Sequence, residues 1–385
     1  MSTVDLSVQY CGLGLKNPLV ISPAGITETV DRIKRCEDAG AAAVVMKSYF
    51  ELPEARSFPT PAFRILARSV GPYRTSTLYS YEQASHFDIQ RYGEELRRAC
   101  SECDIPVLGS VMCVTSSGWQ QALQVCEQAG TPAVEINTSC PHGAYALERG
   151  GIVQAAAETI ELGKSITDLP LIAKMTPQLD DPPSAAQALQ QAGAAAVVMF
   201  NRFTGLDIDL ERLHPILHGG YAGHGGAWML NYTLRWLSAA YPQLSIPIAA
   251  SGGLTRGKDV LKMIAAGATV TQTCTAVVIE GYEVIEKLLR EVYEVMETHG
   301  WENLADLRGI VCDRIVSGEQ VHRRRTVVAK IDAAACTGCG RCAEVCIYGA
   351  VQTVENYSVA PDLCSGCGLC TQLCPAECIQ MVPVQ

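Results

Sequence analysis

Cysteine is concentrated near the C-terminus of the 385-residue chain, where nine of the 18 cysteines lie between residues 336 and 378. Eight of the nine form two copies of the spacing C-x2-C-x2-C-x3-C, in the segments CTGCGRCAEVC (336–346) and CSGCGLCTQLC (364–374). Such a run places thiolates around an iron–sulfur cluster. Two zinc sites are the alternative, although zinc sites usually use paired C-x2-C units. The two runs predict two [4Fe–4S] clusters, and therefore electron transfer.

Each run supplies three thiolates from one loop and a fourth from the short helix that follows. In two-cluster ferredoxins this fourth cysteine binds the other cluster. The predicted ligands of one cluster are therefore Cys336, Cys339, Cys342 and Cys374, and those of the other are Cys364, Cys367, Cys370 and Cys346. The ninth cysteine, Cys378, lies beyond the motif, and we expect it to be a small buried residue.

A different cysteine stands in the segment INTSCPHGA (136–144). The apolar run AVEI (133–136) ends in a polar cluster from Asn137 to Cys140, and Pro141 then stops regular strand pairing. A simple turn would use Gly, Asn or Asp. A thiol at the end of a strand, three residues after an amide, points instead to a chemical role, with a small buried residue as the alternative.

Polar groups also end the other apolar runs. They are Lys47-Ser48, Asn137, Lys174, Asn201, Ser251-Gly252-Gly253 and Thr273-Cys274-Thr275. A lone Lys at a strand end is more often a surface or salt-bridge residue, but so many polar groups at neighbouring strand ends indicate a shared ligand site. Gly252, Gly253 and Thr275 suit a phosphate, and lysines can stabilise the N1–C2=O edge of a reduced flavin. FMN fits this set, whereas no G-x-G-x-x-G motif for a dinucleotide follows a strand.

Eight short, apolar, β-branched runs carry these polar groups. They occupy residues 19–24, 43–48, 106–112, 133–139, 170–176, 196–201, 247–253 and 268–275. Helical patterns such as 31–40, 119–130 and 258–267 alternate with them, and several end in Ala-Gly before the next strand. Continuous apolar strands between amphipathic helices are typical of an α/β fold with a parallel sheet. Eight such units predict a (β/α)8 TIM barrel, with an open doubly wound sheet as the alternative.

The chain is predicted to divide into an FMN-binding barrel (1–309), a linker (310–330) and a small α+β two-cluster ferredoxin-like domain (331–385). The opening segment 4–18 predicts a hairpin that closes the bottom of the barrel. Two connections, 49–82 and 202–228, are too long for simple loops and follow the C-terminal ends of strands. We therefore expect them to be lids or binding loops.

Composition excludes several classes of partner. The net charge of −10 argues against nucleic acid, with the basic run HRRRTVVAK (322–330) as a solvated linker face or a docking patch. Hydrophobic residues make up 48% of the chain, yet no apolar run reaches the ~18 residues of a membrane span. The first residues lack the basic and apolar parts of a secretory signal. We expect a cytoplasmic protein whose cysteines are reduced and bind metal.

The segments EINTSCPHG, AKMTP and ASGG, with the closing cysteine repeat, resemble the dihydropyrimidine dehydrogenase family and its wider relatives, the class 1 dihydroorotate dehydrogenases. The resemblance covers residues 5–310 and 331–385 and is to the bacterial subunit that carries FMN and two clusters. It implies a small-molecule substrate and an electron donor, which is either an NAD(P)H-oxidising FAD/iron–sulfur subunit or a ferredoxin. It also implies a homodimer or a heterotetramer.

By this resemblance Cys140 is the general acid/base, which protonates one carbon of a C=C bond while N5 of reduced FMN delivers hydride to the neighbouring carbon. The implied FMN contacts are Ala24, Gly25, Lys47, Ser48, Asn137, Lys174, Asn201, Gly225, Gly226, Gly252, Gly253, Cys274 and Thr275. The implied substrate contacts are Asn137, Ser139, Asn201, Arg202 and Tyr79.

Two positions depart from the family pattern. Tyr79 or Ser80, in STLYSYEQ (76–83), stands where the family has Asn, and Arg202 stands where it has Thr. Arg and Tyr favour a carboxylate or another anion. The family default is reduction of uracil or thymine to the 5,6-dihydro form. The alternatives are the same chemistry on another unsaturated heterocycle or carboxylate, a dihydroorotate dehydrogenase-like oxidation, and a non-catalytic electron-transfer subunit.

Overall fold

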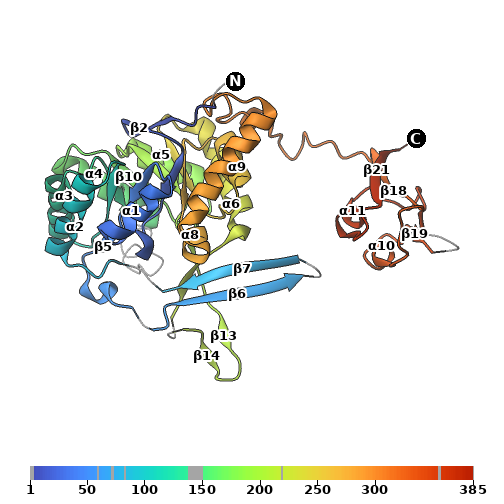
Figure 1. The fold of residues 1–385 in the computed structure, drawn as a ribbon, viewed down its shortest axis with the longest axis horizontal. Helices are drawn as coiled ribbons and strands as arrows, with labels where there is room; N and C mark the ends of the chain where they lie inside the picture. Colours follow the sequence, from blue (N-terminus) through green and yellow to red (C-terminus); the bar gives the residue numbers. More distant parts are fainter. Residues whose placement is uncertain are drawn as a thin grey trace. The chain divides into compact units, whose positions relative to one another are not determined.

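The structure is a computed structural model that describes residues 4–58, 60–70, 73–81, 84–137, 151–217, 220–353 and 357–384. The chain forms two compact units, Met1–Ile315 and Val316–Gln385, and each is described by itself (Figure 1). In the described part of the chain, no helix has both the length and the apolar character that crossing a membrane requires.

The larger unit is built on a closed ring of eight parallel strands. They are β3 (Leu19–Ile21), β4 (Ala43–Val45), β8 (Val107–Met112), β9 (Val134–Ile136), β10 (Leu171–Lys174), β11 (Ala196–Met199), β16 (Ile248–Ser251) and β17 (Val270–Thr273). Each strand pairs in parallel with its neighbours, and β4 pairs with β8, which closes the ring. The TIM barrel and its eight strands are therefore confirmed, and the open sheet is excluded. A two-residue strand, β5 (Tyr49–Phe50), adds to the far end of β8.

Helices cover the outside of the barrel. They are α1 (Val30–Asp38), α2 (Ile89–Glu102), α3 (Ser116–Ala129), α4 (Ile152–Ile166), α5 (Pro182–Gln191), α6 (Leu230–Ala240), α7 (Gly257–Ala265), α8 (Thr275–Glu280) and α9 (Glu283–His299). Their ends follow from local capping: Asp88 accepts from the Arg91 N–H at 2.8 Å to begin α2. Gly130, with φ of 80°, provides the left-handed residue that ends α3.

A short hairpin closes one end of the barrel. It consists of β1 (Val8–Tyr10) and β2 (Leu13–Leu15), which pair antiparallel. Tyr10 and Leu15 are buried among the small apolar side chains that fill the barrel interior, such as Val20 and Val198. The hairpin predicted for residues 4–18 is therefore present, and it plugs the end of the barrel that does not carry the polar strand ends.

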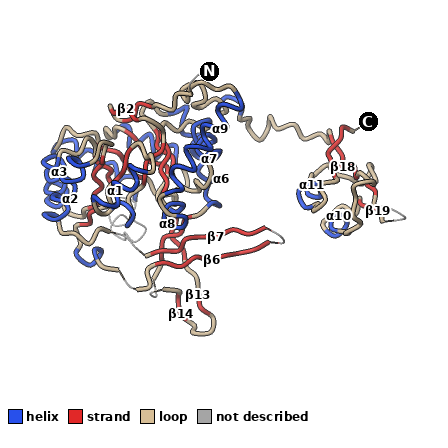
Figure 2. The backbone as a smooth tube through the Cα atoms, in the orientation of Figure 1, coloured by secondary structure: helices blue, strands red, loops and turns tan. Residues whose placement is uncertain are grey.

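The two long connections do not form separate loops. They contribute β6 (Phe63–Val70) with β7 (Tyr73–Ser80), and β12 (Phe203–Gly205) with β15 (Ala222–Gly225), to one antiparallel sheet of order β12-β15-β7-β6. A second small hairpin, β13 (Ile208–Asp209) with β14 (His214–Pro215), lies between β12 and β15 in the chain. Figure 2 shows β6 and β7 extending beyond the barrel. This sheet joins segments that are far apart in sequence and supplies one wall of the site.

The smaller unit is an α+β fold with two short antiparallel sheets. β18 (Val327–Ile331) pairs with β21 (Ile379–Pro383), and β19 (Val351–Gln352) pairs with β20 (Ser358–Val359). The helices α10 (Arg341–Glu344) and α11 (Leu369–Leu373) each begin within a cysteine run. A small core that includes Val328 and Ile379 packs against the cysteines.

Candidate active site

A cavity of ≈ 1140 Å³, its open mouth included, lies at the C-terminal ends of the barrel strands. Twelve of the residues predicted to touch cofactor or substrate line it. They are Ala24, Ser48, Asn137, Lys174, Asn201, Arg202, Gly225, Gly226, Gly252, Gly253, Cys274 and Thr275. Apolar lining that the sequence analysis missed comes from Phe50, Phe63 and Leu78. The strand ends therefore converge on one space.

Glycines let the backbone approach this cavity closely. Gly252 and Gly253 follow β16 with φ of 102° and 89°, a left-handed conformation that favours glycine. A Cβ at Gly252 would lie 2.6 Å from the Met229 sulfur, and one at Gly253 would overlap the Leu230 backbone at the start of α6. The tight Gly-Gly turn is therefore required by packing, and it presents backbone groups to the cavity beside Thr275.

A chain of side-chain hydrogen bonds links the amides at the cavity. Asn201 donates from Nδ2 to Asn137 Oδ1 at 3.2 Å, and Asn137 donates from Nδ2 to Ser48 Oγ at 3.3 Å. The hydroxyls of Ser48 and Ser110 lie 2.7 Å apart. This chain crosses four strand ends and sets the orientation of both amides, which fixes where each donor and acceptor lies.

The two predicted lysines have different surroundings. Lys174 lines the cavity, and its Nζ lies 2.9 Å from Glu135 Oε1. Lys47 is buried, is not among the residues that line the cavity, and places its Nζ 3.7 Å from Glu28 Oε1. Neither acidic partner was identified from the sequence, where nothing marks which carboxylate faces a buried lysine.

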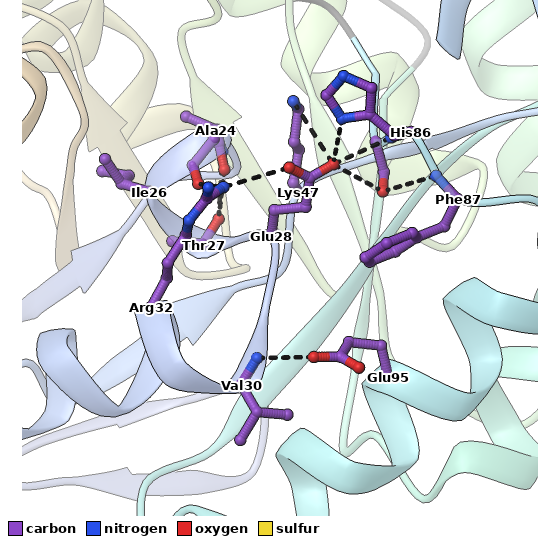
Figure 3. Close-up of polar contacts among 12 residues, drawn as sticks. Ala24, Ile26, Thr27, Glu28, Val30, Arg32, Lys47, His86, Phe87 and Glu95 are labelled. Carbon is purple, nitrogen blue, oxygen red and sulfur yellow. Dashed lines mark hydrogen bonds and ion pairs between the residues drawn. The ribbon is translucent and has the colours of Figure 1, made fainter.

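Glu28 is the centre of a polar cluster (Figure 3). Its Oε1 accepts from the Ser85 hydroxyl at 3.2 Å and from the His86 backbone N–H at 3.0 Å, and it lies 3.0 Å from the His86 Nδ1. Burial raises the pKa of Glu28, but the Lys47 ammonium and the His86 groups outweigh it and hold the pKa below its usual range. The cluster therefore contains a carboxylate that compensates the buried Lys47.

Two candidate substrate contacts, Tyr79 on β7 and Arg202 directly before β12, differ in position. Tyr79 is buried away from the cavity, where its hydroxyl donates to the Gly205 carbonyl at 3.0 Å. Its neighbour Ser80 lines the cavity and accepts a hydrogen bond from the Arg202 guanidinium. A Cβ at Gly223 would overlap that guanidinium, so this glycine of β15 makes the room that Arg202 occupies. The position of Tyr79 thus does not support its predicted contact with substrate.

Gly25 belongs to a one-turn helix, Gly25–Thr27, and is not among the residues that line the cavity. The predicted acid Cys140 and the predicted substrate contact Ser139 lie outside the described residues. Asn137, directly before that segment, lines the cavity.

The cysteines of the smaller unit line two separate cavities. Cys336, Cys339, Cys342 and Cys374 line one together with Cys378, and Cys346, Cys364, Cys367 and Cys370 line the other. The members of each predicted ligand set are therefore gathered at one cavity. Four thiols are the donor set that a [4Fe–4S] cluster uses. Cys378 is buried, as expected, with its sulfur 3.5 Å from that of Cys374.

Backbone N–H groups favour thiolates in these cavities. Ala350 N–H donates to Cys346 Sγ at 3.3 Å, and Ala329 N–H donates to Cys364 Sγ at 3.5 Å. Burial raises the pKa of Cys346, but the surrounding N–H groups outweigh burial and lower it. Because the thiolate is the form that binds metal, the environment of Cys346 suits a ligand.

Comparison with known proteins agrees with both parts of this description. Residues 5–296 match the dihydroorotate dehydrogenase family, and residues 329–381 match the 4Fe-4S dicluster domain. The chain therefore belongs to the dihydroorotate dehydrogenase family and is an oxidoreductase with a 4Fe–4S domain.

The similar proteins fall into two groups. The chain is 26% identical over 372 residues to the NAD-dependent dihydropyrimidine dehydrogenase subunit PreA of Escherichia coli (strain K12), which covers 92% of this chain and 88% of that protein. It is 27% identical over 308 residues to the catalytic subunit of dihydroorotate dehydrogenase B (NAD(+)) of Pyrococcus abyssi, covering 79% of this chain and 98% of that protein. The corresponding subunit of Thermoplasma volcanium is also 27% identical, over 311 residues, with 80% and 99% covered.

Proposed function

We propose that this chain is an FMN-dependent iron–sulfur oxidoreductase that adds a hydride and a proton across an activated C=C bond of a pyrimidine-like substrate. The observation that carries the proposal is the cavity at the strand ends. It joins Lys174, the hydrogen-bonded pair Asn137 and Asn201, and the Gly-Gly turn, in a chain that also holds two cysteine-lined cavities. Reduction of uracil or thymine is the default substrate assignment, supported by the similarity to the dihydropyrimidine dehydrogenase subunit.

Each group in the cavity has a separate task. Bound FMN would supply the hydride. Gly252, Gly253 and Thr275 suit its phosphate, and the Lys174 ammonium suits the edge of the flavin that becomes negative on reduction. The fixed amides of Asn137 and Asn201 offer a donor and an acceptor to an imide. Cys140, which lies outside the described residues, is the proposed proton donor.

We infer that electrons enter through two [4Fe–4S] clusters, one in each cysteine-lined cavity. The donor would be either an NAD(P)H-oxidising FAD/iron–sulfur subunit or a ferredoxin. The similarity to an NAD-dependent dehydrogenase subunit of E. coli supports the first of these. A homodimer or heterotetramer in the cytoplasm is the corresponding assembly.

A carboxylate-bearing substrate is a second candidate, and Arg202 favours it. The guanidinium lines the cavity beside Ser80, and no described lining residue is acidic. A charged, hydrogen-bonding Arg discriminates strongly in favour of a carboxylate. Oxidation of a dihydroorotate-like acid is the corresponding reaction in the reverse direction, and the dihydroorotate dehydrogenase relatives support it.

The test is a reoxidation experiment. Anaerobically purified protein is assayed for FMN, iron and sulfide, reduced with dithionite, and mixed with uracil, thymine, orotate or other unsaturated carboxylates. The proposal expects the visible flavin band to return with at least one of these compounds. A colourless protein, or one inert to the whole panel, would contradict it and favour a non-catalytic electron-transfer subunit. Cys140→Ala should bind FMN normally but lose turnover.

A further inference from the structure

A buried carboxylate lies directly behind the cavity wall. Glu135, on β9, is completely buried and does not line the cavity. Its Oε1 accepts from Lys174 Nζ at 2.9 Å, and its Oε2 accepts from Gln272 Nε2 at 2.9 Å. Both oxygens are thus bonded to side chains that themselves line the cavity, one from β10 and one from β17.

These contacts close a ring. Lys174 Nζ also donates to Gln272 Oε1 at 3.2 Å, and the Ser22 hydroxyl donates to the same oxygen at 3.1 Å. The Lys174 ammonium therefore directs two of its three N–H bonds into the wall, and one N–H remains for a group in the cavity. The ring also fixes which end of the Gln272 amide is the acceptor.

Packing alone does not explain this ring. Many other interior positions of the barrel strands carry Val, Ile, Leu or Ala, such as Val20, Leu108 and Ile172. A buried ion pair is costly to desolvate, and apolar replacements of similar volume are often equally stable. The ion pair of Lys174 and Glu135 lies where the barrel interior borders the cavity. A role in the chemistry of the cavity therefore explains it better than packing does.

We propose that Glu135 is a positioning residue for the flavin chemistry: it holds the Lys174 ammonium in place, and it offsets part of the positive charge that the reduced flavin meets. This inference rests on the proposed function. Loss of the carboxylate leaves a more positive wall, which stabilises the negatively charged reduced flavin and raises its reduction potential. Loss of the ammonium has the opposite effect.

The experiment compares the reduction potential of bound FMN in full-length variants. Glu135→Gln keeps an acceptor for Lys174 and should shift the reduction potential in the positive direction. Lys174→Met should shift the potential in the negative direction. A tenfold change in the ratio of reduced to oxidised flavin corresponds to about 30 mV for a two-electron couple. The matched control is Glu158→Gln, because Glu158 is an exposed carboxylate on α4 and its loss changes the net charge equally. The control should leave the potential unchanged.

The outcomes separate the inference from the proposed function. If the wild-type protein holds no FMN, the proposed function fails. If it holds FMN and Lys174→Met shifts the potential while Glu135→Gln behaves like Glu158→Gln, the role of Glu135 is wrong and the function stands. Should Glu135→Gln not fold, Glu135→Asp is measured instead. Its shorter carboxylate lies farther from the Lys174 ammonium, so the potential should again shift in the positive direction, and an unchanged potential would overturn the proposal.

Discussion

Arg202 contributes a guanidinium to a cavity whose described lining residues include no carboxylate. If a substrate acid binds there, Arg202→Met should raise KM for that acid by roughly 10- to 150-fold, because a hydrogen bond to a charged group is worth about 1.5–3 kcal/mol. Turnover of neutral pyrimidines should change little. Steady-state kinetics with both substrate classes measures the difference, and an equal effect on both would remove Arg202 from substrate selection.

Glu28 should make the barrel sensitive to acid. Its pKa is below the usual value in the folded protein, so its stabilising contribution is complete above the unfolded pKa of about 4.3 and is lost as the pH falls through the folded value. Glu28→Gln removes the charge opposite Lys47 and should cost about 1–3 kcal/mol at pH 7. The difference from wild type should shrink below about pH 4.

All four tryptophans lie before residue 302, so tryptophan fluorescence in the intact chain follows unfolding of the larger unit. Thermal unfolding is compared at pH 7 and at about pH 3 for wild type and Glu28→Gln. Glu286→Gln, whose carboxylate is exposed on α9, is the control and should match wild type at both values. If the difference in thermal stability between wild type and Glu28→Gln stays constant with pH, the charge of Glu28 is not the cause of that difference.

At the level of single residues, the sequence predicted which side chains line the cavity better than it predicted which residues those side chains contact. Lys174 and Asn201 could be assigned to the cavity because a polar group at the end of a buried parallel strand has few other places to go. The pairing of Lys47 with Glu28 could not be predicted, because Glu28 precedes α1 and Lys47 follows β4. Both lysines contact a buried carboxylate, and only the folded chain decides that Lys174 lines the cavity while Lys47 does not.

At the level of elements, the register of one sheet decides what reaches the cavity. β7 and β15 pair so that Tyr79 is opposite His224 and Ser80 is opposite Gly223. Neighbouring side chains of a strand point to opposite faces, so Ser80 and Tyr79 cannot both face the cavity. The sequence showed that this segment departs from the family, but the choice between the two residues depended on a register set by a distant strand.

Gly223 offers a test of this arrangement. A methyl group at this position would overlap the Arg202 guanidinium, which must then move away from Ser80. Gly223→Ala should therefore reproduce the loss of acid selectivity expected for Arg202→Met, while FMN binding stays normal. Gly14→Ala is the control, since its added Cβ meets only the Gln9 side chain, at 3.4 Å. If Gly223→Ala keeps wild-type selectivity, Arg202 does not depend on this space.

The barrel strands and helices were predictable because each has a strong local period and a cap, as with Asp88 at α2. The antiparallel sheet was not predicted. β6 and β7 form a local hairpin, but β7 also pairs with β15, which belongs to the other long connection. No local pattern marks a pairing between segments so far apart in sequence. Prediction of those connections as binding loops nevertheless located the segments that supply Arg202 and Ser80 to the cavity.

At the level of the whole molecule, two units divide the proposed work between substrate chemistry and electron supply. The larger unit holds the cavity at the strand ends, and the smaller unit holds the two cysteine-lined cavities. The linker at 310–330 and the cluster ligands stay predictions. The cysteine runs could be recognised in the sequence because the spacing within each run is a local property, whereas the substrate depends on contacts between elements.

The crossed cysteine sets make a prediction for the intact protein. Cys346 belongs to the first run in sequence but lines the cavity of Cys364, Cys367 and Cys370. Cys346→Ser should therefore lose the same cluster as Cys367→Ser, with about half of the iron remaining and the same EPR spectrum of the reduced protein. Cys339→Ser should lose the other cluster and keep the complementary signal. An EPR spectrum of Cys346→Ser that matches Cys339→Ser would mean that each run binds its own cluster. In all three variants, dithionite-reduced flavin should still be reoxidised by substrate, because the barrel is intact, while turnover with a one-electron donor should fall.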